Sequence, residues 1–185
     1  MTTYVALLRA VNVGGRKPVR MADLCACVRD LGFPDVRSLL QSGNLVLRAP
    51  ARSPAKIEAA LERGLAKRLQ LTTEVLVRSA AEWRAHIRAN PFAAEAKADP
   101  GHLLMLALKR APGPAQVAAL REAIRGRERV SVNGRTLYAV YPDGVGRSKL
   151  TIAVIERHLD TRATGRNWNT VRKIEELAGS PARPR

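Results

Sequence analysis

The sequence predicts an α+β protein built of two similar halves, each an antiparallel sheet with helices packed on one face. Hydrophobic residues make up 46% of the 185 residues and occur along the whole chain, as in folded proteins. Up to residue 78, short apolar runs and amphipathic stretches alternate in the order βαββαβ, which is the ferredoxin-like arrangement. A similar order begins again after residue 101, so we expect a second half of the same kind.

The first ferredoxin-like half is expected to lie within residues 1–90. A short apolar run at 4–9 is typical of a buried strand, and apolar residues then recur at helical spacing from Met21 to Leu31. Two further strands, at 36–40 and 45–48, are joined by the tight polar turn Gln41-Ser42-Gly43-Asn44. This turn and its flanking strands predict a hairpin.

A second helix completes the βαββαβ order of this half. Ser53 is expected to cap it and Pro54 to open it, and a single apolar stripe follows. The fourth strand is expected at 72–77. Ser79 and Glu82 then form the capping-box pattern of an added helix that runs to Asn90. Residues 91–100 are alanine-rich and unpatterned, and they are the predicted linker between the halves.

The second half is expected at residues 101–185, with the same order of elements. A strand at 102–108 and a helix at 114–125 come first, followed by a hairpin at 129–141 that turns at Asn133-Gly134. A helix at 148–158, a short strand at 162–166 and a final helix at 167–178 follow.

The chain is strongly basic, with a formal net charge of +16 from 32 Lys and Arg against 16 Asp and Glu. Such a charge attracts nucleic acids, acidic membranes or phosphorylated ligands. Arginine far outnumbers lysine, which biased coding also explains, and the basic residues form no long block. The sequence also lacks paired aromatic residues at alternate positions of a central strand, because Tyr138 and Tyr141 are three apart. Nucleic acid is therefore the less favoured of the anionic partners.

The sequence gives no support for several other classes of protein. Cys25 and Cys27 are expected to point to different faces of a helix, which suits neither a disulfide nor a metal pair. No cationic leader or long apolar segment is present, so we expect a cytoplasmic protein without a membrane partner. The three histidines are scattered and no carboxylate pair is readable, so the sequence predicts no metal or cofactor and leaves open whether the protein is an enzyme.

The first candidate ligand site is the basic glycine loop that follows the first strand. Gly14 and Gly15 allow backbone amides to approach a bound group closely, and Arg9, Lys17 and neighbouring arginines surround them. This chemistry suits a phosphate or another anion. The alternative is an ordinary crossover loop with solvated cations.

A second basic glycine loop contains Gly146, Ser148 and Lys149 before a predicted helix. Its spacing is not that of a nucleoside triphosphate-binding loop, because one residue separates the glycines and Ser precedes Lys. In the alternative interpretation, Ser148 is simply the N-cap of the helix.

Polar donors also crowd the start of the last helix around one indole. Arg166, Asn167, Asn169 and Thr170 could hold an anion at the helix start, and Trp168 offers a flat face. Equally, Asn167 could be the N-cap and Trp168 a core residue.

These motifs together resemble a widespread bacterial family, domain of unknown function 1697. The similarity covers nearly all of the chain and is carried by Tyr4 to Gly15, Met21 and Leu24, the turn Gln41 to Asn44, Asn90-Pro91-Phe92, Gly146 to Leu150, and Arg166 to Val171. Ala10 departs from the pattern, because the family usually has glycine there, so this strand end is expected to be less open to a ligand. The resemblance implies two ferredoxin-like halves and no established activity or cofactor.

The sequence thus leads to one site hypothesis, a polar cleft where the loops of both halves converge to bind a phosphorylated or otherwise anionic small molecule. This hypothesis assumes that strands one and three of a half run parallel and adjacent, so that the loop after strand one and the turn Gln41 to Asn44 lie at the same end of the sheet. The alternatives are a nucleic-acid-binding protein that uses basic loops and a structural or interaction module without a ligand. The predicted ligand-binding residues are Arg9, Asn12, Gly14, Gly15, Lys17, Gln41, Ser42, Asn44, Gly146, Ser148, Lys149, Arg166, Asn167, Trp168, Asn169 and Thr170.

Overall fold

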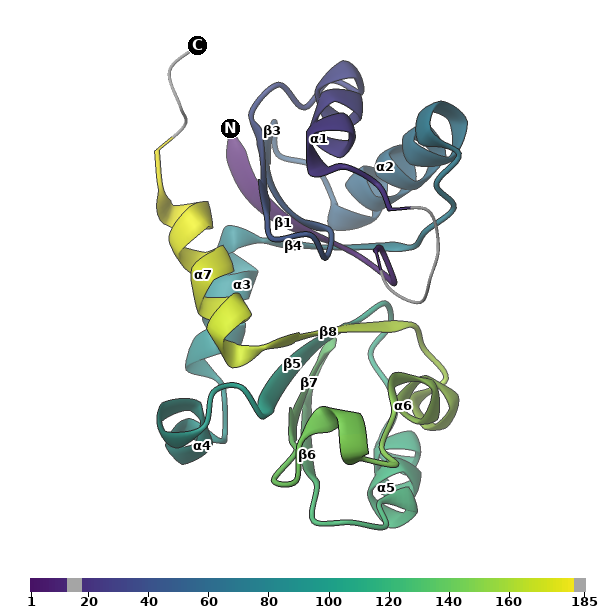
Figure 1. Ribbon diagram of the computed structural model, residues 1–185, viewed down its shortest axis with the longest axis vertical. Helices are drawn as coiled ribbons and strands as arrows, with labels where there is room; N and C mark the ends of the chain where they lie inside the picture. The colour runs from purple at the N-terminus through teal and green to yellow at the C-terminus, as the bar shows by residue number, and fades with distance from the viewer. Residues whose placement is uncertain (13–17, 182–185) are drawn as a thin grey trace. The chain divides into compact units, whose positions relative to one another are not determined.

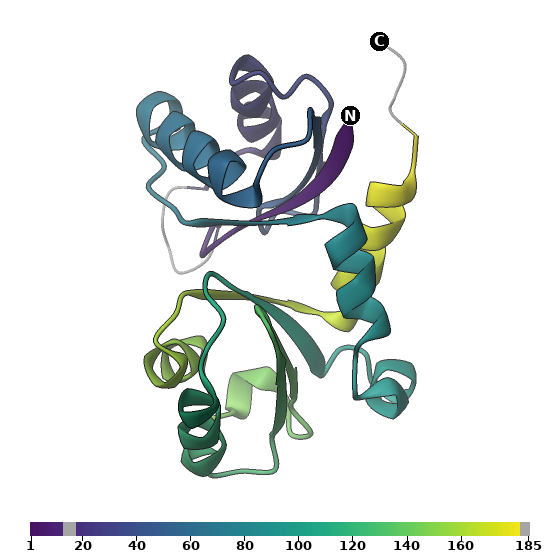
Figure 2. The same cartoon turned by 180° about the vertical axis from the view of Figure 1, so that it is seen from behind.

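The chain divides into two compact units in the computed structural model, which describes residues 1–12 and 18–181. The first unit comprises residues 1–85 together with 173–185, and the second comprises residues 86–172 (Figures 1 and 2). The predicted α+β fold of two ferredoxin-like halves is confirmed. Each unit contains a four-stranded antiparallel sheet.

The sheet of the first unit has the strand order β2-β3-β1-β4. Its strands are β1 (Thr2–Leu8), β2 (Val36–Leu39), β3 (Asn44–Ala49) and β4 (Val75–Ser79). Helices α1 (Met21–Asp30) and α2 (Pro54–Leu69) cover one face of it (Figure 1). Because side chains alternate along a strand, Ala6 and Leu8 of β1 point to this face and pack with Leu24 and Leu61 of the helices. This burial is the core that holds the end of β1 in place.

The second unit repeats this order as β6-β7-β5-β8. Its strands are β5 (Leu103–Leu108), β6 (Arg129–Asn133), β7 (Thr136–Val140) and β8 (Ala163–Asn167). Helices α5 (Pro114–Ala123) and α6 (Ile152–Leu159) cover one face (Figure 1). Leu106, Leu120 and Ile155 are fully buried there. The remaining elements are α3 (Ala80–Arg88), α4 (Ala93–Ala98), the 3-10 turn η1 (Val145–Arg147) and α7 (Trp168–Gly179).

The repeat extends to single hydrogen bonds, although the two sequences have little in common. In the first unit the amide of Val75, at the start of β4, donates to Glu62 Oε1 of α2 at 2.9 Å. In the second unit the amide of Ala163, at the start of β8, donates to Glu156 Oε1 of α6 at the same distance. Each glutamate directly follows a buried residue of its helix, so the last strand is tied to the second helix in the same way twice.

The helices that follow these last strands also begin alike. Ser79 Oγ accepts from the amide of Glu82 at 3.1 Å, and Glu82 Oε2 accepts from the amide of Ser79, which confirms the predicted capping box. Asn167 Oδ1 accepts from the amide of Thr170 at 3.0 Å in the second unit. Both α3 and α7 therefore start from a side-chain cap at the last residue of a strand.

Four details differ from the sequence-based expectations. Strands β1 and β3 are adjacent as expected, but they are antiparallel rather than parallel. Helix α6 begins at Ile152 with Thr151 as N-cap, so Ser148 is not its cap. Ser53 occupies the N-cap position of α2 without a side-chain cap bond. The predicted linker 91–100 contains the short helix α4.

Within residues 1–12 and 18–181, no helix is both long enough and apolar enough to cross a lipid bilayer.

Candidate anion-binding site at the end of strand β1

The side chain of Asn12 holds together the two ends of the basic glycine loop. Its Nδ2 donates to Val19 O at 3.0 Å, and its Oδ1 accepts from Val19 N at 2.7 Å. The same Nδ2 donates to Gln41 O at 2.8 Å. Asn12 has a φ of 56°, a left-handed conformation that asparagine adopts more readily than most residues. One side chain thus closes the loop and joins it to the turn after β2.

The glycine loop itself, with Gly14, Gly15 and Lys17, lies outside the described residues. The structure therefore gives the frame of the loop, which consists of Asn12 on one side and Pro18 and Val19 on the other.

The turn Gln41 to Asn44 is shaped by two residues that face the end of β1. Gly43 has a φ of +71°, and its carbonyl accepts from Leu8 N at 2.9 Å. A Cβ at this glycine would lie 2.8 Å from Leu8 Cβ, so the close approach requires glycine. Asn44 is buried, and its Nδ2 donates to Leu39 O at 2.9 Å and Ser42 Oγ at 3.0 Å. Ser42 and Asn44 therefore hold the turn itself.

The antiparallel pairing of β1 and β3 explains why loop and turn meet. Leu7, near the end of β1, is opposite Asn44, the first residue of β3. Strands β1 and β2 are both antiparallel to β3, so they run in the same direction. The turn after β2 and the loop after β1 therefore lie at the same end of the sheet. The expected proximity of loop and turn is correct, although the strand direction assumed for it is wrong.

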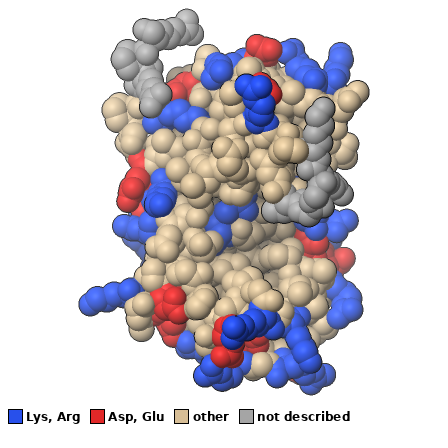
Figure 3. Space-filling view, viewed as in Figure 1, with Lys and Arg blue, Asp and Glu red and all other residues tan. Residues whose placement is uncertain are grey.

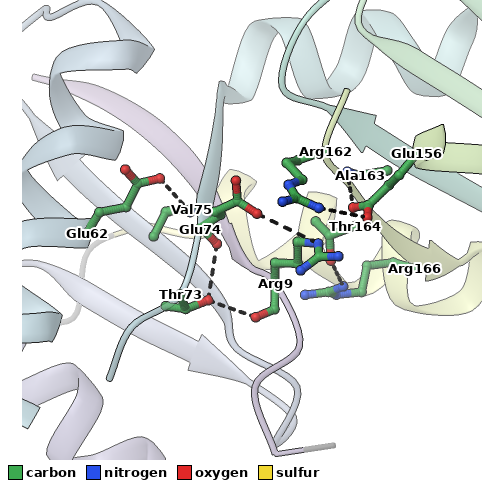
Figure 4. A network of polar contacts seen from close by, with 10 residues as sticks. All are labelled: Arg9, Glu62, Thr73, Glu74, Val75, Glu156, Arg162, Ala163, Thr164 and Arg166. Atoms are coloured by element: carbon green, nitrogen blue, oxygen red, sulfur yellow. Dashed lines mark hydrogen bonds and ion pairs between the residues drawn. The ribbon is translucent and has the colours of Figure 1, made fainter. Parts of the chain in front are cut away.

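Arg9 lies beside this frame in a polar network on the neighbouring strand (Figure 4). Its Nε is 3.9 Å from Glu74 Oε2, and Thr73 Oγ1 donates to Arg9 O at 2.7 Å. A cavity of about 410 Å³ adjoins the network and is lined by Arg9, Ala10, Glu62 and Glu74 among others. A cavity of about 520 Å³ lies at the other end of the loop, beside Pro18, Val19 and Arg20, and both cavities reach Thr72.

In the second unit, Ser148 is held by bonds of its own. Its Oγ donates to Glu128 Oε1 and accepts from Leu150 N at 2.9 Å. Gly146 belongs to the 3-10 turn η1, which Lys149 closely follows. This loop is therefore a folded turn that leads to α6.

Arg166 is buried near the end of β8, and its guanidinium is turned back onto its own strand. Its Nη1 donates to Thr164 Oγ1 at 2.9 Å (Figure 4). The same Nη1 also donates to Gly165 O at 2.8 Å. Burial lowers the pKa of Arg166 to about 10, because the surroundings solvate the charge less well than water does. The side chain still carries its charge at neutral pH.

The following residues match the capping interpretation of the sequence. Asn167 caps α7 through Thr170, and Trp168 is buried, with its amide donating to Pro100 O at 3.1 Å. Asn169 is exposed. The described contacts thus bring Asn12, Gln41, Ser42 and Asn44 together in the first unit. Whether the residues of the second unit join them in one cleft stays a prediction.

Sequence reasoning missed Glu62 and Glu156, which fix the last strand of each sheet beside the loops. The signal was present in the sequence, since Leu61-Glu62-Arg63 and Ile155-Glu156-Arg157 are the same apolar-Glu-Arg pattern in the second helix of each half. This signal was difficult to recognise because each glutamate bonds to a backbone amide, and every residue except proline has one whatever its side chain. Among the described residues, no group of three His, Cys, Asp or Glu side chains is arranged to hold a metal ion.

The fold and these repeated contacts define a two-unit α+β protein of ferredoxin-like halves. The chain belongs to the family described as "Protein of unknown function (DUF1697)", whose model matches residues 1–138. A solved structure of a conserved bacterial protein from Streptococcus pneumoniae is similar, with 23% sequence identity and a TM-score of 0.74 over 96% of this chain and 98% of that one. This likeness shows the fold. No curated protein matches the chain.

Proposed function

We propose that the protein binds a phosphorylated or otherwise anionic small molecule at the basic glycine loop after β1. The observation that supports this most is the threefold bonding of Asn12, which fixes both ends of the loop and the turn after β2. A loop whose ends are fixed loses less conformational freedom on binding a ligand than one with free ends. Gly14 and Gly15 would present amides, and Arg16 and Lys17 would supply charge.

A small ligand fits the distribution of charge better than a polyanion does. Figure 3 shows Lys and Arg side chains scattered over the viewed face, with Asp and Glu side chains between them. Several arginines of the second unit are also paired with carboxylates, and the pairs are Arg110 with Asp160, Arg127 with Asp143, and Arg129 with Glu95. Duplex DNA or RNA is usually bound by a continuous basic surface. The loop instead offers local positive charge.

The test is a thermal-shift screen of the full chain against pyrophosphate, nucleoside phosphates, sugar phosphates and a duplex oligonucleotide. A ligand at about 100 times its dissociation constant stabilises the protein by about 2.7 kcal/mol, which is readily measured. The matched variants are Lys17→Gln in the loop and Arg84→Gln, an exposed cation of α3 that serves as the control.

We expect one class of small phosphate compounds to stabilise the wild-type protein and Arg84→Gln, and to lose most of its effect on Lys17→Gln. Equal binding to both variants would contradict the loop site. Stabilisation by the duplex alone, with a steep loss on adding salt, would favour the nucleic-acid alternative instead.

A further inference from the structure

A further cavity in the first unit has a larger excess of positive charge, among its described lining residues, than the two cavities beside the loop. It has a volume of about 950 Å³, against about 410 and 520 Å³ for the cavities beside the loop. It lies along the edge strand β2 and the end of α7, and among the residues that the structure describes Arg29, Arg37 and Arg48 line it with the single carboxylate of Asp35. Three guanidinium charges against one carboxylate leave two positive charges in excess. In the cavity beside Arg9, by contrast, two carboxylates face one arginine.

Two of these arginines are neighbours on the same face of the sheet. Arg37 of β2 is opposite Val46 of β3, and Arg48 lies two residues further along β3. Side chains in this diagonal relation have Cα atoms about 7–8 Å apart, and like charges in such pairs repel each other. An anion placed between the two guanidinium groups would remove that repulsion.

The cavity arginines are also incompletely bonded within the described part of the chain. The Nη1 of Arg37 is 3.4 Å from Pro181 O and its Nη2 is 3.3 Å from Ser180 O, both long for hydrogen bonds. Its Nε is buried and has no hydrogen-bond partner there. Arg48 Nη1 is 3.9 Å from Asp35 Oδ2, too far for a hydrogen bond. Buried donors normally find acceptors, so Arg37 retains unused bonding capacity at this place.

The remaining walls of the cavity are partly apolar, and they include Val36 and Leu177. Such walls suit a ligand that carries an apolar group beside its charge. The cavity volume of about 950 Å³ also exceeds the space that an inorganic ion alone would fill.

We propose that this cavity is a second ligand site, which binds a small phosphate monoester. The phosphate would lie on the planar guanidinium forks of Arg37 and Arg48, and its organic group would lie against Leu177. A phosphate monoester carries a charge of about −1.5 to −2 near pH 7, which matches the excess of two positive charges. The site shares no residue with the glycine loop and is independent of the function proposed there.

The test is calorimetric titration of the full chain with phenyl phosphate, which has the required charge and apolar group, and with phenol, which lacks the charge. Arg37→Gln and Arg48→Gln are expected to weaken phenyl phosphate binding by about tenfold or more, as for the loss of a charge-assisted bond. Asp35→Asn is expected to strengthen it, because the competing carboxylate is gone. Arg84→Gln serves as the control and is expected to bind as the wild-type protein does. Lys17→Gln is expected to retain the part of phenyl phosphate binding that Arg37→Gln loses.

Three results would overturn the proposal. They are the absence of phenyl phosphate binding, equal binding of phenyl phosphate and phenol, and a loss of binding in Lys17→Gln that matches the loss in Arg37→Gln. The last result would place the ligand at the loop and so separates the two proposals. If Arg37→Gln does not fold, the exposed Arg29→Gln on α1 takes its place, with the same expected direction.

Discussion

Replacement of Asn12 tests the idea that one side chain closes the glycine loop. Asn12→Ala removes three hydrogen bonds to Val19 and Gln41. At a partly exposed site water replaces part of each bond, so we expect a loss of about 2 kcal/mol for the three. Alanine at a φ of 56° adds about 1 kcal/mol of backbone strain. The total expected loss in the free energy of unfolding is about 3 kcal/mol.

Two further variants at Asn12 separate these contributions. Asn12→Gly loses the bonds but adopts the left-handed conformation without strain, so its expected loss is about 2 kcal/mol. Asn12→Asp retains the oxygen that accepts from Val19 N, but it places a charged carboxylate oxygen 2.8 and 3.0 Å from the carbonyl oxygens of Gln41 and Val19, so its expected loss is at least that of Asn12→Gly.

The measurement is urea unfolding followed by tryptophan fluorescence. The chain has two tryptophans, and Trp83 lies in the first unit while Trp168 lies in the second. In a Trp168→Phe background the signal comes from the unit that contains Asn12. If Asn12→Ala unfolds within about 0.5 kcal/mol of the background protein, a range usual for surface changes, the loop is not closed by this side chain. If Asn12→Ala and Asn12→Gly are equally stable, the bonds matter and the strain argument is wrong.

Three other predictions concern the elements around the site. Gly43→Ala should destabilise the protein by about 3 kcal/mol, whereas Gly134→Ala, also at positive φ but with open space around its Cβ position, should lose only about 1 kcal/mol; equal losses in urea unfolding would refute the steric argument. Ser79→Ala should lose about 1 kcal/mol through its cap, and no loss in the same assay would show that the capping box is unimportant. Burial raises the pKa of Tyr138 and Tyr141 to about 12, so stability should fall as the pH rises from about 10 towards 12, and phenolate absorbance should appear there. Ionisation of every tyrosine near pH 10 in protein still folded by circular dichroism would contradict this.

The order and type of the elements could be predicted because the signals are local. The apolar residues of β1, the turn Gln41 to Asn44 and the capping box at Ser79 each act within a few residues of the chain. The same is true of Asn167, whose capping bond joins residues three apart. The two-half fold follows from such local preferences once their order is seen to repeat.

The contacts that build the candidate sites were decided by the tertiary structure. Asn12 bonds to backbone atoms of Val19 and Gln41, and Glu62 bonds to the amide of Val75, so no particular side chain is required of the partner. The neighbouring positions of Arg37 and Arg48 depend on the pairing of β2 with β3.

The relative direction of paired strands is likewise not predictable from the sequence. The continuous apolar run at residues 4–8 indicates that β1 is a buried strand, but the run reads the same for a parallel and an antiparallel neighbour. The antiparallel pairing of β1 with β3 is fixed by the path of the whole chain, through the crossover of α1 and the hairpin of β2 and β3. The sequence by itself thus determined the elements and their order, whereas the backbone hydrogen bonds between distant segments decided which side chains meet.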